Sequence, residues 1–522
     1  MIRIKQIKLP VKHEEKDLKN KIIKKLNIKK EDLLEIKINK KSIDARKDIN
    51  IVYEVDVKTN KEKQILNKNI ENVSKTPNEE YTFKIEGKEP LKNRPVIVGS
   101  GPAGLFAAYI LAKHGYKPII IERGQKIEER IKTVEKFWKT NKLNPESNMQ
   151  FGEGGAGTFS DGKLNTTIKD KNYRIKHILK IFEKNGAPKE ITYIKNPHIG
   201  TDYLRKIIIN IRNEIISMGG TFKFNTCLKD IKIENNEVKE IITNKENIKT
   251  NILILAIGHS SRDTINMLNN KLLIKPKPFA IGIRIQHPQK WINENQYKNY
   301  SKYLPNASYK LTYNVNGRGV YSFCMCPGGF VINASSEEEK IAINGMSNYK
   351  RDEENANSAI IVTITPKDFG NSPLDGITFQ KKLEEKTYEI GKGNIPIQLL
   401  KDFKQNRKST NLGKIKPIFK GKYTLTNIRN IFPQYISDTL EKGITYFGTK
   451  IKNFDNDDTI LAAIESRTSS PIKIERNENL EANIKGIYPC GEGAGYAGGI
   501  ISAAVDGIKV AEEIAKKFKP FE

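Results

Sequence analysis

The 522-residue sequence contains only four cysteines, two tryptophans and six histidines. Four cysteines in a chain of this length do not make the framework of a disulfide-stabilised secreted protein, so we expect a reducing cytoplasm. The sequence has no run of eighteen apolar residues, so we expect no membrane span. Its start, "MIRIKQIKLPVKHEEKD", lacks the apolar segment of a secretory signal. No group of Cys and His residues has the spacing of a metal site, and we predict no metal.

The net charge of +29 comes from 90 Lys and Arg residues against 61 Asp and Glu residues. A basic balance of this size is compatible with a nucleic-acid partner. However, the Lys residues are spread along the whole chain among Asp and Glu, and no Arg-rich tract with interleaved aromatic residues occurs. We therefore predict a small-molecule substrate in preference to nucleic acid.

The residue pattern divides the chain into four segments. Residues 1–88 follow the order β-α-β-β-α-β, which predicts a ferredoxin-like α+β module whose last strand is "YTFKI" (81–85). We expect this module to have a structural or regulatory role. Strands and helices alternate through residues 89–270, whereas residues 271–450 are richer in Gly, Tyr and Phe. Residues 451–522 end in a predicted strand, a glycine loop and a closing helix.

Three stretches fit the pattern G-x-G-x-x-G: "GSGPAG" (99–104), "GEGGAG" (152–157) and "GAGYAG" (493–498). In a dinucleotide-binding unit the motif follows a buried strand, opens a helix and precedes an acidic residue about twenty positions further on. Only the first stretch meets all three conditions, with Glu122 at the end of the second strand, "KPIII". We expect the other two to be loops where backbone approaches a ligand closely.

Each glycine of the first motif has a predicted role. Gly99 forms the tight turn, Gly101 lets a pyrophosphate approach the backbone, and Gly104 lets the helix pack against the strand. The helix then directs its N-terminal amides at the phosphates. We expect the Glu122 carboxylate to accept hydrogen bonds from a ribose hydroxyl, which disfavours a 2′-phosphate.

The first motif and its flanks, "GSGPAGLFAAYILAKHG…IIIER", resemble the FAD fingerprint of the glutathione-reductase-like flavoproteins. The stretches "LILAIGHSSRD" (253–263) and "GIYPCGEGAGYAGGIISAAVDG" (486–507) resemble the two further pieces that complete the nucleotide domain of those proteins. The stretch "QFGEGGAGTFSDGKLNT" (150–166) is similar to their loop against the pyrophosphate and isoalloxazine. More narrowly, "FGEGGAGTFSDGKLNT", "FCMCPGG", "NANSAI", "ESRTSSP" and "PCGEGAGYAGG" together resemble the bacterial FAD-dependent dehydrogenases, including their extra N-terminal module.

The resemblance implies an α/β fold in which the three glycine clusters are three walls of one FAD site. A Rossmann-like FAD-binding domain (89–270 and 451–522) would carry an inserted α+β substrate or cap domain (271–450) and the N-terminal module. It implies that Gly258 lies near the pyrophosphate, Glu492 near the ribityl or phosphate region, and Gly499 and Ile500 at the pyrimidine edge of the flavin. The residues implied to bind FAD are Gly99, Gly101, Pro102, Ala103, Gly104, Glu122, Arg123, Gly154, Gly155, Ala156, Thr158, Lys163, Leu228, Gly258, Gly491, Glu492, Gly493, Gly499 and Ile500.

The stretch "FCMCPGG" contains two candidate catalytic thiols, Cys324 and Cys326. In a regular strand these residues face the same side with Cα atoms about 6.6 Å apart. This separation is near the upper limit for a disulfide. A redox dithiol, a single thiolate near the flavin and a pair of buried packing thiols therefore all remain open.

Lys163 and the histidines are the other candidates for chemistry. Lys163, in "SDGKLNT", is the cation expected nearest the flavin, where it would stabilise negative charge or bind phosphate. His259 follows Gly258 directly and is a candidate acid or base, as are His198 and His287. For each histidine alone, the alternative is a hydrogen-bonded structural role.

The sequence thus predicts an FAD-dependent oxidoreductase that transfers a hydride through flavin N5 to or from a small molecule. NAD(P)H is a candidate transient donor. Two alternatives stay open: a flavoprotein that acts on tRNA, which the basic charge would suit, and a flavin-binding sensor without turnover.

Overall fold

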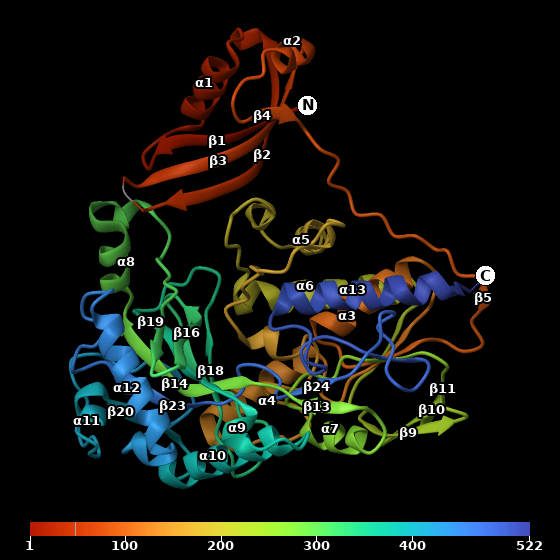
Figure 1. The fold of residues 1–522 in the computed structure, drawn as a ribbon, viewed down its shortest axis with the longest axis vertical. Coiled ribbons are helices and arrows are strands. Elements are labelled where there is room, and N and C mark those ends of the chain that lie inside the picture. The colour runs from red at the N-terminus through yellow and green to blue at the C-terminus, as the bar shows by residue number, and fades with distance from the viewer. Residues whose placement is uncertain (47, 522) are drawn as a thin grey trace.

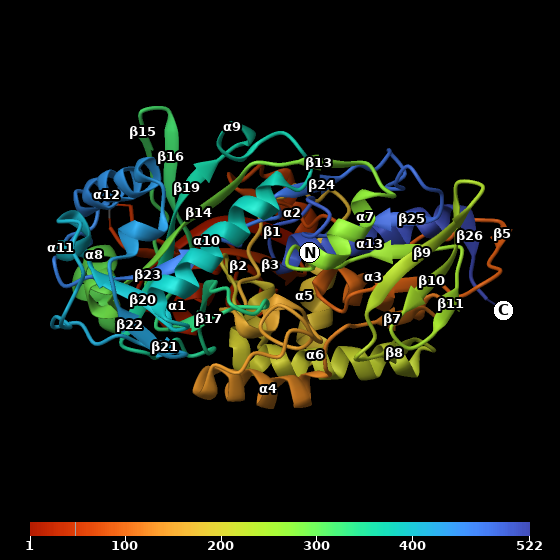
Figure 2. The same cartoon turned by 90° about the horizontal axis from the view of Figure 1, so that it is seen from below.

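A computed structural model describes residues 1–46 and 48–521 as an N-terminal module and two larger domains (Figure 1). Figure 2 shows the two larger domains side by side, with α11 and α12 at one end of the molecule and β9 to β11 at the other. One domain contains a five-stranded sheet and the other a seven-stranded sheet. Within the described residues, none of the helices combines the length and apolar character needed to cross a bilayer.

The N-terminal module packs one layer of helices on a four-stranded sheet. Its elements are β1 (Ile2–Pro10), α1 (Glu15–Leu26), β2 (Leu33–Asp44), β3 (Asn50–Thr59), α2 (Glu62–Asn67) and β4 (Val73–Lys75). The sheet order is β2-β3-β1-β4. Leu18, Ile22 and Leu26 recur at helical spacing on α1, and their burial fixes this helix on the sheet.

The prediction of a last strand at residues 81–85 was wrong. The edge position next to β1 is taken by β4, and residues 76–88 instead run along the neighbouring domain. There the ring of Tyr81 packs 4.7 Å from that of His177, and Phe83 stacks on His114 at 4.2 Å. Tyr81 and Phe83 are therefore covered by side chains of the neighbouring domain and do not belong to a strand of the module's sheet.

The five-stranded sheet is parallel throughout. Its order is β25 (Ile487–Pro489), β12 (Leu253–Leu255), β6 (Val96–Val98), β7 (Ile119–Ile121) and β8 (Thr221–Lys223). Strands β6, β12 and β25 are fully buried, as expected for parallel strands covered on both faces. The unit β6–α3 (Pro102–Lys113)–β7 confirms the predicted Rossmann-like strand–helix–strand, and with it the α/β class.

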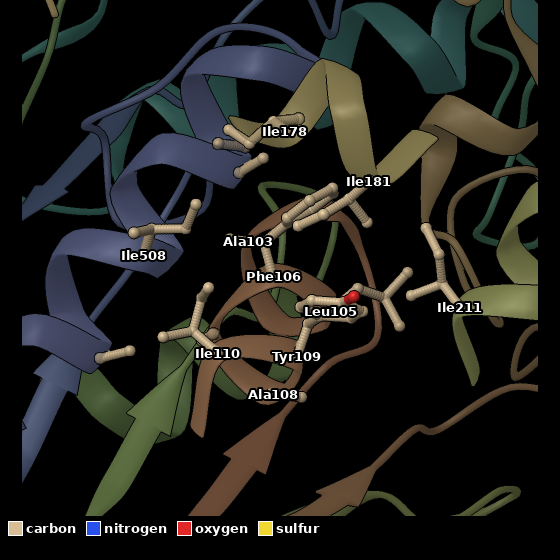
Figure 3. Packing of buried hydrophobic residues seen from close by; sticks show 14 of the residues in the cluster. Ala103, Leu105, Phe106, Ala108, Tyr109, Ile110, Ile178, Ile181, Ile211 and Ile508 are labelled. Atoms are coloured by element: carbon tan, nitrogen blue, oxygen red, sulfur yellow. The ribbon is translucent and has the colours of Figure 1, made fainter. Parts of the chain in front are cut away.

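Helix α3 forms the centre of this domain's core. All residues from Ala103 to Ala112 are buried, because α13 (Ile500–Lys517), α5 (Arg174–Lys184) and α6 (Gly200–Ser217) surround the helix. Figure 3 shows Phe106 of α3 among Ile178 and Ile181 of α5, with Ile508 of α13 on the other side. Helices α3 and α13 touch at Gly507, where a Cβ would lie 2.1 Å from the carbonyl oxygen of Ala103. This close contact sets the first turn of α3 against the middle of α13.

Smaller elements complete this domain. They are α4 (Ile127–Thr140), β9 (Leu228–Glu234), β10 (Glu237–Thr243), β11 (Asn247–Lys249), α7 (Arg262–Asn269), and the pairs β13 (Ile274–Pro276) with β24 (Ile472–Ile474) and β5 (Glu89–Pro90) with β26 (Phe518–Lys519).

The seven-stranded sheet has the order β15 (Thr312–Val315), β16 (Arg318–Cys326), β19 (Asn355–Ile364), β14 (Phe279–Pro288), β23 (Ile460–Glu465), β20 (Ile395–Leu399) and β22 (Tyr423–Leu425). Helices α8 (Gln289–Tyr297), α10 (Asp375–Gly391) and α12 (Gln434–Gly448) pack against it, and α9 (Pro366–Phe369), α11 (Leu400–Lys404), β17 (Phe330–Asn333), β18 (Ile343–Met346) and β21 (Phe419–Lys420) complete the domain. Strand β23 lies beyond the predicted segment boundary at residue 450 and pairs with β14 and β20 in the middle of this sheet.

Candidate functional site

A cavity of about 1390 Å³ lies where the two larger domains meet. Most ligand pockets measure roughly 300–1,000 Å³, so this one has room for a dinucleotide and a second molecule. Glycines of all three G-x-G-x-x-G stretches line it, among them Gly101, Gly155 and Gly498. The second domain contributes residues 308–310, 322–325 and 467–469, and the N-terminal module contributes Asn39 and Lys40.

The first glycine loop opens helix α3 onto the cavity. Gly99 has φ +98°, and a Cβ there would lie 2.4 Å from the carbonyl oxygen of Ala256. A Cβ on Gly104 would lie 1.9 Å from the carbonyl oxygen of Gly99. The first turn of the helix therefore packs directly against the glycine turn. No side chain of the described residues caps the first amides of the helix. Amides left free at a helix N-terminus form a ready site for an anionic group.

The Glu122 carboxylate joins the first glycine loop to the second. It accepts hydrogen bonds from Ser100 N at 3.0 Å, Ser100 Oγ at 2.8 Å, Gly124 N at 3.0 Å and Gly152 N at 2.9 Å. A carboxylate has about four acceptor sites, and only the Ser100 hydroxyl among these donors can turn away freely. A ribose hydroxyl would therefore have to displace the Ser100 hydroxyl, and the ribose contact stays a prediction.

The second glycine loop is held from behind by Arg130 of α4, a residue that the sequence did not single out. Its fully buried guanidinium donates to five carbonyl oxygens, those of Asn148, Met149, Gly152, Glu153 and Gly155, at 2.7–3.2 Å. Burial lowers the pKa of Arg130 to about 9. A Cβ on Gly152 would lie 2.4 Å from Arg130 Cδ, so this glycine accommodates the arginine and not a nucleotide.

The loop that contains the third glycine stretch packs against the turn at Gly258 and against α3. A Cβ on Gly493 would lie 2.5 Å from the carbonyl oxygen of Gly258, and one on Gly491 would lie 2.7 Å from Ala103 Cβ. The loop leads to Gly499, the N-cap of α13, which has no capping side chain from the described part of the chain. The N-termini of α3 and α13 thus both line the cavity.

Three observations test whether these residues fit FAD. A Cβ on Gly258 or Gly498 would meet no atom of the described residues within 4 Å, so the space before them is open cavity. Both ring nitrogens of His259 are buried without a hydrogen-bond partner among the described residues, although Nδ1 lies 3.1 Å from Glu492 Oε1. With two uncapped helix N-termini, this arrangement fits a ligand that has a pyrophosphate and a flat ring with polar edges.

The predicted FAD-binding residues fall into two groups. Those that line the cavity are Gly99, Gly101, Pro102, Ala103, Glu122, Arg123, Gly155, Ala156, Lys163, Leu228, Gly258, Glu492, Gly499 and Ile500. Gly104, Gly154, Thr158, Gly491 and Gly493 instead lie behind the lining, where they let loops and helices touch. Of the histidines, His259 lines the cavity, whereas Nε2 of His287 lies 2.7 Å from the carbonyl oxygen of Phe454 and Nε2 of His198 lies 2.9 Å from that of Tyr349.

The regular-strand geometry predicted for Cys324 and Cys326 does not hold. The pairing of β16 with β19 shifts between Phe323 and Cys326, which marks a bulge, and Cys324 has φ +43°. Cys324 lines the cavity, whereas Cys326 is fully buried behind it, with its Sγ 3.4 Å from the carbonyl oxygen of Cys324. Bulges re-aim side chains near functional sites.

Lys163 lies beside this bulge and is held by a buried carboxylate. Its Nζ lies 2.9 Å from Asp161 and donates to the carbonyl oxygen of Met325. Asp161 also accepts a 2.8 Å hydrogen bond from Arg351 Nε. Although burial alone would raise the pKa of Asp161, the charges of Lys163 and Arg351 lower it to about 2. Asp161 is therefore a fixed anion.

Two further buried ion pairs near the cavity were also missed. Arg284 pairs with Glu465 at 2.9 Å, and Arg467 pairs with Glu384 at 2.9 Å. Each pair joins residues far apart in the chain, so no local spacing signals it. Among the described residues, no group of three or more His, Cys, Asp or Glu side chains is placed to hold a metal ion.

Comparisons with known proteins give matches over most of the chain. The family model described as FAD-dependent protein, C-terminal domain-like, matches residues 278–468, and an NAD(P)-binding Rossmann-like domain matches residues 97–143. A domain of unknown function matches residues 1–58. An uncharacterized protein of Clostridium beijerinckii is 49% identical over 529 residues, which covers 99% of each chain.

Two solved structures illustrate the wider likeness. L-proline dehydrogenase from P. horikoshii has a TM-score of 0.35 and 16% identity, over 82% of this chain and 94% of its own. Glycine oxidase from Bacillus cereus has a TM-score of 0.36 and 11% identity, over 82% of this chain and 99% of its own. Likenesses at this level carry no information on the substrate.

Proposed function

The chain belongs to a family of FAD-dependent oxidoreductases, and we propose that it transfers a hydride between FAD held in this cavity and a small molecule bound against the second domain. The observation that supports this proposal most is the shared lining of the cavity. Residues of all three glycine stretches line it together with residues 308–310 and 322–325 of the second domain. A two-electron transfer needs this juxtaposition of cofactor and substrate surfaces.

The residues of the first domain would hold the cofactor. The free amides at the start of α3, near Gly101, would receive the pyrophosphate, and Gly258 and Gly498 would leave space for the ligand. When bound, FAD supplies hydride chemistry at N5. The N-terminus of α13, at Gly499, presents the positive end of the helix dipole to the cavity and so favours negative charge on any group placed there.

The substrate side of the cavity combines hydroxyl, thiol and cationic side chains. Ser308, Ser322 and Cys324 line it together with Lys163 and Arg467. Lys163 and Arg467 are paired with Asp161 and Glu384, so this mixture suits a small polar molecule that forms hydrogen bonds with hydroxyl, thiol and cationic groups. We also propose a cytoplasmic location, since four cysteines in 522 residues are too few for a disulfide framework.

NAD(P)H is the electron donor that we propose. The test is an anaerobic titration of the purified protein, first with NADPH and then with NADH, followed by the visible absorbance of the flavin. We expect the oxidised flavin spectrum to bleach with one of the two donors at about one equivalent. A flavin that stays oxidised with both donors would overturn the nicotinamide-linked proposal and direct the search to reduction by the substrate.

A further inference from the structure

We propose that Cys324 Sγ is an anionic nucleophile of the cavity, which adds covalently to the carbonyl carbon of a bound small molecule with Lys163 as its counter-cation. This assignment concerns the chain's own thiol and does not depend on the nicotinamide donor. It stands on the backbone geometry, the buried charges and the packing around residue 324.

The backbone turns Cys324 toward the cavity at some conformational cost. A residue with a Cβ rarely adopts φ near +43°, and the bulge in β16 interrupts pairing with β19 at this point. Arg284 Nη1 donates to the carbonyl oxygen of Cys324 at 3.2 Å, and Asn357 Oδ1 anchors the same nitrogen at 2.7 Å. The surrounding structure therefore holds Cys324 in a strained conformation that places the residue in the cavity lining.

The charges around Cys324 leave one positive charge in excess. Three cations lie in this region: Lys163 and Arg284 act on Cys324, and Arg351, from the loop before β19, shares Asp161 with Lys163. Only two carboxylates oppose them within the described chain, Asp161 beside Lys163 and Arg351, and Glu465 beside Arg284. A thiolate at Cys324 completes the balance, and the pKa of nearby His198 is lowered by burial, which keeps that ring neutral.

Cys326 supplies the hydrogen bond that a thiolate needs. Its S–H lies within reach of both the Cys324 carbonyl oxygen, at 3.4 Å, and the Cys324 sulfur. When Cys324 is ionised its sulfur is the stronger acceptor, and the Cys326 S–H then turns from the carbonyl oxygen to this sulfur. This hydrogen bond, with Lys163 and Arg284 acting against burial, lowers the pKa of Cys324, while the pKa of Cys326 is raised far above its usual range.

The chemistry that this arrangement suits is addition to a carbonyl group. The sulfur lone pair forms the S–C bond, and the C=O π electrons move to oxygen, which takes a proton from solvent. No leaving group and no oxidant are needed. The Lys163 ammonium, which is 28% exposed and lies beside the bulge, is placed to stabilise the charge that develops on the oxygen.

The test measures the alkylation of Cys324 by iodoacetamide in the purified full-length protein, with peptide mass spectrometry as the readout. An ordinary thiol with a pKa of about 8.5 is only about 1% thiolate at pH 6.5. We expect Cys324 to react at pH 6.5 nearly as fast as at pH 8.5. Cys227 and Cys490 are internal controls, because burial raises the pKa of both thiols.

Variants of Lys163 separate a charge effect from a change of fold. We expect Lys163→Met to lower the alkylation rate of Cys324 at pH 6.5 at least tenfold, and Lys163→Arg to preserve it. Millimolar propanal should slow alkylation reversibly in the Lys163→Arg variant, which cannot form an imine at this position. An alkylation rate that rises steeply through pH 8.5, or a Cys324 that does not react, would contradict the assignment of Cys324 as an anionic nucleophile. An alkylation rate that propanal does not change would contradict the assignment of a carbonyl compound as the substrate. None of these readouts uses the flavin, so they are independent of the nicotinamide titration.

Discussion

Gly101 and Gly155 lie backbone against backbone, so that a Cβ on Gly155 would come within 3.1 Å of Gly101 Cα. Gly154 N also donates to the carbonyl oxygen of Ser100 at 2.9 Å. These residues belong to two stretches that fit the same dinucleotide consensus, yet both stretches line one cavity. The contact accounts for the repeated motif without a second nucleotide site, since glycine is required wherever two backbones meet this closely.

Replacement of Gly258 by Ala should weaken FAD binding by about tenfold or more, because the new Cβ would enter the open cavity. Gly258 has φ +69°, so the change also strains the backbone. Gly317 is the matched control: it has φ +84°, its Cβ would likewise meet no described atom within 4 Å, and it lies in the exposed β15–β16 turn. Fluorescence titration of FAD should show weaker binding only for Gly258→Ala. Equal affinities in the two variants would contradict the placement of the ligand.

Replacement of Arg130 by Met should destabilise the protein by about 3 kcal/mol or more, because five loop carbonyls would lose their donor and each buried unpaired group costs about 1–3 kcal/mol. Urea denaturation measures the effect. The control is Lys136→Met, an exposed position on the same helix, which should change stability by less than about 0.5 kcal/mol. A loss below about 1 kcal/mol for Arg130→Met would contradict the role of the arginine as support for the loop.

Glu153 should make stability fall as pH rises. Its Oε2 accepts from Arg212 at 2.7 Å, but Oε1 has no partner among the described residues, and burial raises the pKa of Glu153 to about 7 against the effect of Arg212. The folded pKa is above the unfolded value of about 4.3. The neutral carboxyl therefore contributes stability that is complete below the unfolded pKa and is lost as pH rises through the folded pKa of about 7.

The Glu153→Gln variant should remove this component, which amounts to about 2–3 kcal/mol between pH 4.5 and pH 8. Urea denaturation of both proteins across this range gives the difference. Glu129→Gln, an exposed change on the same helix as Arg130, should keep the wild-type pH dependence. If Glu153→Gln also kept it, the proposed titration of this buried carboxyl would be ruled out.

The connection at residues 76–88 should resist trypsin although it contains Lys84 and Lys88. Tyr81 donates a 3.0 Å hydrogen bond to Glu512, and Phe83 stacks on His114. The double change Tyr81→Ala, Phe83→Ala should raise the cleavage rate at these lysines at least tenfold, because proteolysis follows local opening. Mass spectrometry locates the cut, and Tyr423→Ala, a change of an exposed tyrosine, is the control. Equal cleavage in the two proteins would show that the contacts do not anchor the connection.

The nucleotide-binding unit could be predicted from the sequence because all of its signals are local. The strand at Val96–Val98, the helix start at Pro102 and the strand before Glu122 follow each other within one strand–helix–strand unit. The loops at Gly154 and Gly493 could also be set apart from a second Rossmann unit. The first loop does not follow a strand, and no acidic-ended second strand follows the helix after the second loop.

The supporting residues could not be predicted, because their partners are distant in the chain. Arg130 binds carbonyl groups of another loop, and Asp161 meets Arg351 from a different domain. The bulge at Cys324 has no local signature, since it depends on the register against β19. Tyr81 and Phe83 are a similar case, because their alternation with other residues is the pattern of a strand. The pattern predicts that one face of the segment is buried, but it does not say which part of the molecule buries it.

The central claim is that three glycine clusters form one FAD site, and the most direct measurement is the amount of FAD per chain. The purified protein, reconstituted with excess FAD and desalted, is denatured, and the released flavin is identified by chromatography and quantified by absorbance against protein concentration. This account predicts about one FAD per chain. A ratio near two or three would mean that the other glycine stretches bind nucleotides of their own, and a ratio near zero would contradict the FAD site itself.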